Sequence, residues 1–129
     1  MEEQPGLSDE YRKASPWPLF VALGFAVSEI GVFLGIFPVA VGGVLLLGGS
    51  VAGILRESEY ATRTWRTLGL LGLAFALLGA AVVAAGASGP LSLTAVVADP
   101  NGAVGRGLAI AVGGLTLVAA SVVGRLSTI

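Results

Sequence analysis

Glu29 is the residue whose chemistry fits its surroundings least. It lies in "FAVSEIGVFLG", residues 25–35, among apolar or small neighbours. An ionised carboxylate inside a membrane is costly, so such a group is protonated, paired or in contact with water. Three roles follow: a neutral glutamate hydrogen-bonded to a neighbouring helix, an ion pair, or a proton or cation relay. We favour the first because Ser28 beside it suits a polar contact between helices, and because Asp99 and Arg106 lie towards the far interface, although Arg106 would reach inward if its helix began early.

The rest of the chain offers little chemistry. It has no cysteine or histidine, one methionine and one lysine, so the usual ligands of zinc, iron–sulfur clusters and haem are missing. No serine has a histidine as its base, and the acids Glu57 and Glu59 belong to an arginine-rich loop. The formal net charge of −1 gives no argument for nucleic acid as a partner. We therefore expect no enzyme activity, no metal and no cofactor.

The composition indicates a membrane protein, in which Glu29 and Ser28 would lie on a helix. Hydrophobic residues make up 55% of the 129 positions and charged residues 12%, against about 25% charged in soluble domains. Four apolar segments stand out, at about 18–35, 38–55, 67–87 and 103–126. About 18 helical residues at ~1.5 Å each span a ~30 Å hydrocarbon core. The sequence thus predicts an all-α integral membrane protein with four transmembrane helices arranged as two hairpins.

The polar and turn-forming stretches between these segments predict the organisation of the chain. A polar tail, 1–16, precedes a first hairpin, 17–55, whose two helices are joined by a tight turn at "GIFP". The charged loop "RESEYATRTWR", 56–66, leads to a second hairpin, 67–126, which contains an external linker, 88–102, rich in turn-forming residues.

Basic residues predict the orientation of the spans. With four spans, only Arg106 lies on the side opposite the others, which places both termini in the cytoplasm of a multi-pass cell-membrane protein. The interfacial and cytoplasmic residues expected to contact partners are Trp17, Trp65, Arg12, Lys13, Arg56, Arg63 and Arg66. Arg125 falls on the same side.

Small residues four apart predict close helix packing. Gly31 and Gly35 form one GxxxG pair, and Gly49 and Gly53 form another. They serve either packing within the bundle or a surface for partner helices. Segments 41–55 and 112–126 are also identical at eight of fifteen positions. This likeness reflects either an internal duplication, which makes Leu77 the equivalent of Glu29, or the shared composition of apolar helices.

Two motifs carry a resemblance to a known family. "PGLSDEYRKASPWPLFVALGFAVSEIGVFLG" and "FPVAVGGVLLLGGSVAGILRE" cover roughly residues 5 to 57. This stretch resembles small haloarchaeal membrane proteins labelled "cox cluster protein", whose genes sit beside those of haem–copper terminal oxidases. The resemblance implies a non-catalytic accessory subunit or assembly factor of a membrane respiratory complex. Its partners would be the lipid bilayer and oxidase subunits, or further copies of itself. The alternative is a small proton- or cation-coupled transporter or channel that uses Glu29.

Overall fold

The computed structural model describes residues 15–58, 63–86 and 102–127, almost all of them in four α-helices. These are α2 (Trp17–Leu34), α3 (Phe37–Glu57), α4 (Thr64–Gly86) and α6 (Gly102–Ser127). All four are long and apolar enough to cross a membrane, so the protein is a multi-pass membrane protein, as predicted. The predicted tail residues 1–14 and linker residues 88–101 lie outside the described part of the chain.

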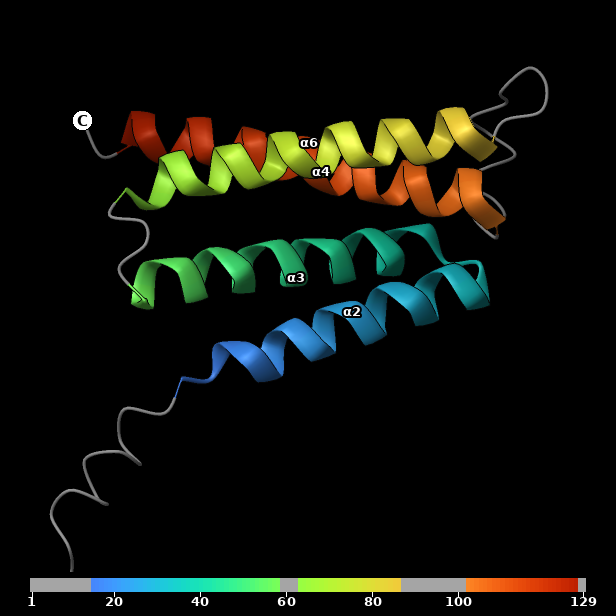
Figure 1. Cartoon of the computed structure of the whole chain (residues 1–129), viewed down its shortest axis with the longest axis horizontal. Helices are drawn as coiled ribbons and strands as arrows, with labels where there is room; N and C mark the ends of the chain where they lie inside the picture. Colours follow the sequence, from blue (N-terminus) through green and yellow to red (C-terminus); the bar gives the residue numbers. More distant parts are fainter. Residues whose placement is uncertain (1–14, 59–62, 87–101, 128–129) are drawn as a thin grey trace, which may run out of the picture.

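The helices form two hairpins that pack side by side. α2 packs against α3, α4 packs against α6, and the two hairpins meet mainly where α3 lies beside α6 (Figure 1). The start of α2, the end of α3, the start of α4 and the end of α6 all lie at one end of the bundle (Figure 1). The α2–α3 turn lies at the other end. This confirms the predicted arrangement of four spans as two hairpins.

The turn between α2 and α3 depends on a left-handed glycine. Gly35 has φ 75° and ψ 30°, a conformation that costs other residues energy because of their Cβ atom. The Ile36 amide donates to the Gly31 carbonyl at 2.8 Å, which closes the end of α2. Pro38 then lies in the first turn of α3, where its missing N–H group leaves no broken hydrogen bond. The predicted turn at "GIFP" is confirmed.

The charged connection at the other end is shorter than predicted. α3 continues through Glu57 and α4 already begins at Thr64, so both ends of the predicted loop 56–66 are helical. The Ser58 amide and hydroxyl both donate to the Ile54 carbonyl, and the Arg56 guanidinium donates to the Thr64 hydroxyl. These bonds let the helices extend beyond their apolar segments.

Glycines bring the backbones of each hairpin into contact. In the first hairpin, a Cβ on Gly24 or Gly43 would overlap with the backbone of the facing helix. Gly72 and Gly114 hold the same positions in the second hairpin. Without a hydrophobic driving force between helices in lipid, such close approach is a main source of their association.

The same contacts recur at fixed offsets, 48 residues between α2 and α4 and 71 residues between α3 and α6. Gly31 faces Ala40 in the first hairpin, and Gly79 faces Ala111 in the second. Likewise, the indole rings of the two tryptophans lie over equivalent glycines: Trp17 on Gly53 and Trp65 on Gly124. The hairpins are therefore built alike in their internal packing, as the repeat interpretation of the sequence requires.

Candidate functional site

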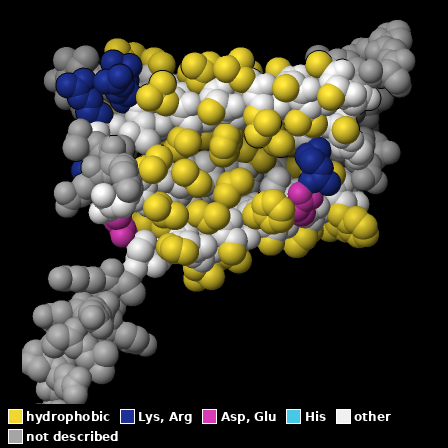
Figure 2. Space-filling model, viewed as in Figure 1, with side chains coloured by type: hydrophobic (Ala, Val, Ile, Leu, Met, Phe, Trp, Pro, Cys, Tyr) yellow, Lys and Arg dark blue, Asp and Glu magenta, His cyan; other side chains and the backbone are white. Residues whose placement is uncertain are grey.

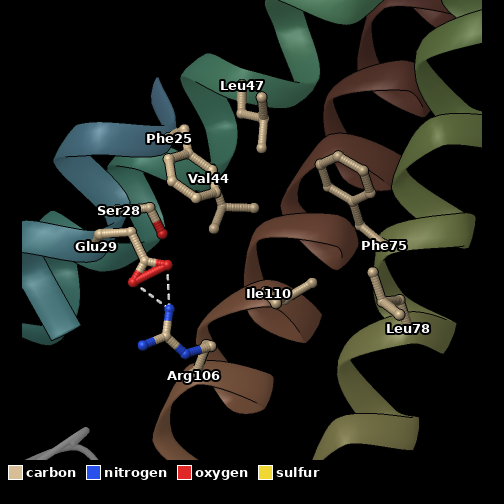
Figure 3. Close-up of a pocket in the computed structure, with 9 residues that line it drawn as sticks. All are labelled: Phe25, Ser28, Glu29, Val44, Leu47, Phe75, Leu78, Arg106 and Ile110. Atoms are coloured by element: carbon tan, nitrogen blue, oxygen red, sulfur yellow. Dashed lines mark hydrogen bonds and ion pairs between the residues drawn. The ribbon is translucent and has the colours of Figure 1, made fainter. Parts of the chain in front are cut away.

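Glu29 of α2 and Arg106 of α6 form an ion pair between the two hairpins. The Arg106 Nη1 group donates to both carboxylate oxygens of Glu29 (Figure 3). Of the three roles that the sequence left open, this geometry matches the ion pair and not the neutral contact that we favoured. Arg106 reaches Glu29 because α6 begins at Gly102, which places the guanidinium one turn inside the helix.

The pair lies near one end of the bundle and not at its middle. Glu29 lies five residues before the end of α2 and Arg106 four residues after the start of α6. At ~1.5 Å per residue, both lie about 6–8 Å inside the helix ends. Their side chains are 37% and 43% exposed. In Figure 2 a blue and magenta patch interrupts the mostly apolar face towards the end where the α2–α3 turn lies.

A groove of about 240 Å³ adjoins the pair, and all four helices line it. Figure 3 shows the ion pair at one end and apolar side chains along the rest. The apolar lining consists of Phe25, Val44, Leu47, Phe75, Leu78 and Ile110. Ser28 adds a hydroxyl next to Glu29. The site is therefore amphipathic, and its polar groups lie towards the end of the bundle that contains the α2–α3 turn.

Close backbone packing fixes the α2 side of the groove. The Ser28 backbone rests against Gly43 of α3, where a Cβ would overlap with the Ser28 amide nitrogen. This contact sets the rotation of α2 about its axis, and with it the direction of the adjacent Glu29. On α6, Ile110 lies one turn beyond Arg106, so both residues face the same groove.

The geometry leaves Arg106 able to bind a further group. A guanidinium has five N–H donors, and those beyond Nη1 have no partner among the described residues. Planar acceptors such as a carboxylate or a phosphate suit this fork. The site can therefore hold a hydrogen-bond acceptor at its polar end and an apolar group in the groove.

The predicted interfacial residues lie at the opposite end of the bundle. Trp17 and Trp65 are half-buried against glycines of their own hairpins. Arg56 contacts Thr64, as described above. A second cavity, of about 220 Å³, is lined by Arg63, Thr64, Trp65, Arg66 and Arg125. Arg12 and Lys13 lie outside the described residues.

The four glycines predicted to pack helices have different roles. Gly31 packs inside the first hairpin and Gly53 receives the Trp17 indole. Gly35 adopts a left-handed conformation that ends α2. Gly49 has open space where a Cβ would be, so no neighbouring helix among the described residues approaches it closely on that side. The GxxxG spacing alone did not distinguish these cases.

Serine and threonine side chains within the spans form two kinds of hydrogen bond. Ser50 and Thr116 donate to carbonyls four residues earlier in their own helices. Ser121, the equivalent of Ser50, instead donates across the hairpin to the Trp65 carbonyl at 2.7 Å. It thus joins α6 to α4 near the tryptophan.

Sequence reasoning did not identify the groove-lining residues Phe25, Phe75 and Ile110. They look like ordinary apolar helix residues, and only the contact between hairpins brings them together. Arg106 had a usable signal: it follows the start of its helix by about one turn, just as Glu29 precedes the end of its own. The predicted topology therefore places both charged residues in the same half of the bilayer.

Comparisons with known proteins identify the family of this chain. No curated protein and no solved structure matches the sequence. One family model does, over residues 1–127 and thus nearly the whole chain. The protein belongs to the Family of unknown function (DUF7541).

Proposed function

We propose that this protein is a non-catalytic subunit or assembly factor of a larger membrane complex, and that its Glu29–Arg106 groove faces the partner. The observation that carries the proposal is the exposed ion pair within membrane-spanning helices. Charged side chains in spans usually face the bundle interior or a water-filled cavity. Here the two side chains are 37% and 43% exposed at the surface of the bundle.

A partner helix would remove the cost of this exposure. Arg106 has N–H donors to offer, and the neighbouring groove accepts apolar side chains. A transmembrane helix with one polar acceptor and several apolar residues would fit both parts. Such a contact would place the ion pair inside the assembly, where intramembrane charges usually lie.

The resemblance of residues 5 to 57 to the cox cluster proteins suggests the partner, a haem–copper terminal oxidase. The chain would accompany the catalytic subunits without carrying electrons, since it lacks cysteine and histidine. Its basic end would lie in the cytoplasm of the cell membrane, because Arg56, Arg63, Arg66 and Arg125 gather there.

Transport through this site has less support. Beyond the ion pair, the groove is lined by aromatic and aliphatic side chains, with Ser28 as its further polar member among the described residues. A relay needs successive polar groups or water along its path. Proton flux in liposomes that Glu29→Gln abolishes would nevertheless favour transport over the accessory role.

Affinity purification from native membranes in mild detergent tests the proposal. We expect the wild-type chain to recover oxidase subunits. Leu78→Trp should lower that recovery strongly, because a larger ring would fill the groove. Leu77→Trp is the matched control, since the Leu77 side chain is 64% exposed and does not line the groove. Wild-type protein purified without any oxidase subunit, or equal recovery with both variants, would contradict the proposal.

A further inference from the structure

The two hairpins contact each other through faces that are not equivalent in the repeat. On α3, the contact uses Val44 and Gly48. On α6, it uses Gly113 and Leu117: Val44 meets Gly113, and the Leu117 Cδ1 atom meets Gly48. A two-fold contact would instead pair the same face of both hairpins. The arrangement is head-to-tail: α3 and α6 use different faces for the contact. On each helix, the face equivalent to the one that the other helix buries therefore stays free, and we call it the unmatched face.

On α3, the unmatched face contains Gly42 and Leu46. By the offset of 71 residues they correspond to Gly113 and Leu117 of α6, which are buried against α3. Gly42, in contrast, has open space where a Cβ would be, and Leu46 is exposed. The first hairpin thus presents to the membrane the surface that the second hairpin uses for docking.

On α6, the unmatched face contains Leu115 and Ala119. They correspond to Val44 and Gly48 of α3, both buried in the contact between hairpins. Leu115 is 60% exposed and Ala119 is also exposed. The second hairpin therefore presents the surface complementary to the free face of the first.

We propose that a second copy of this chain docks here and repeats the internal contact between molecules. Leu115 of one copy would lie over Gly42 of the next, as Val44 lies over Gly113 within the chain. Leu46 would lie over Ala119, as Leu117 lies over Gly48. The occupant is a second copy because the two free faces are the repeat equivalents of the two faces that already pack together within the chain.

Head-to-tail contacts extend from copy to copy and close into a ring only if the rotation between units permits it. The self-association is separate from the proposed function, because it uses the outer faces of α3 and α6 and none of the groove residues. Small residues at the contact suit helix association in lipid, where close packing replaces the hydrophobic effect.

Cysteine cross-linking of purified protein in liposomes tests the interface, since the native chain has no cysteine. Gly42→Cys and Leu115→Cys are prepared separately, then reconstituted together and oxidised. We expect a disulfide-linked dimer in the mixture and almost none with either variant alone. Phe33→Cys with Leu115→Cys is the control, since Phe33 is an exposed α2 residue outside this face. No dimer in the mixture, or equal cross-linking of Gly42→Cys alone, would overturn the head-to-tail interface.

A blocking substitution gives a second readout. Gly42→Leu has space in the monomer but would fill the place reserved for Leu115 of the next copy. We expect it to convert the reconstituted oligomer to monomer in single-molecule photobleaching without lowering the thermal stability of the protein in detergent. Ala22→Leu, at an exposed position of α2, should leave the oligomer intact. A monomeric wild type, or an oligomeric Gly42→Leu variant, would refute the proposal.

Discussion

Glu29 and Arg106 are 77 residues apart in the sequence, and neither has a charged equivalent in the other hairpin. The repeat places Leu77 at the position of Glu29 and Gly35 at that of Arg106. The ion pair therefore belongs to the contact between the two hairpins and not to the packing within either hairpin. It marks one particular surface of a molecule whose two hairpins have similar internal packing.

The strength of this pair can be measured by a double-mutant cycle. We expect Glu29→Gln and Arg106→Gln each to destabilise the bundle, because each leaves a polar or charged group without its partner. The coupling energy should be about 0.5–2 kcal/mol, the range found for polar contacts between membrane helices. Unfolding free energies measured in bilayers by steric trapping give all four corners of the cycle. Strictly additive effects would show that the pair contributes no stability.

At the scale of the helices, two adjacent glycines of α3 have different surroundings. Gly43 touches the α2 backbone at Ser28, whereas Gly42 faces open space. A helix turns about 100° per residue, so neighbouring positions point to different surroundings. The missing side chain allows the close contact with α2 at Gly43, whereas at Gly42 it leaves room for the proposed second copy.

Alanine scanning separates these two roles. Gly43→Ala should destabilise the first hairpin by about 1–3 kcal/mol, because the added methyl group would overlap with backbone that cannot move aside easily. Gly42→Ala should be neutral or stabilise α3 by up to about 1 kcal/mol, from helix propensity. Thermal unfolding in detergent compares the two variants. Equal losses would contradict the assignment of Gly43 to the hairpin contact.

At the scale of the whole molecule, the protein consists of two similar hairpins with different environments. Both begin and end at the basic end of the bundle (Figure 1). Their head-to-tail contact leaves the groove on one side and two complementary apolar faces elsewhere. The proposed contacts with an unlike partner and with a second copy use different surfaces, so they are compatible with each other.

Thiol labelling in intact cells tests the orientation of the bundle. Ile36→Cys, in the α2–α3 turn, should react with a membrane-impermeant maleimide added outside. Ser127→Cys, at the end of α6, should react only after permeabilisation. The physical reason is that arginines next to membrane spans favour the cytoplasmic side. Labelling of Ser127→Cys alone in intact cells would reverse the proposed orientation.

Local sequence features were enough to predict the four spans, their two hairpins and the turn at Gly35. Each depends on short-range physics: the length of apolar runs, the fixed φ of proline and the tolerance of glycine for positive φ. The agreement of eight of fifteen residues between segments 41–55 and 112–126 was also visible, but it did not distinguish a duplication from shared composition. The ends of the charged loop were misplaced because side-chain hydrogen bonds extended the helices there.

The sequence by itself thus determined that this chain has four membrane-spanning helices arranged as two hairpins. Only the tertiary structure decided that Glu29 pairs with Arg106 and that Gly42 and Gly49 have open space where a Cβ would be. These outcomes depend on the rotation of each helix about its axis and on which faces of the hairpins meet. Spacing along the chain does not specify that choice, because a helix rich in glycine, alanine and leucine offers several faces of nearly equal apolar character.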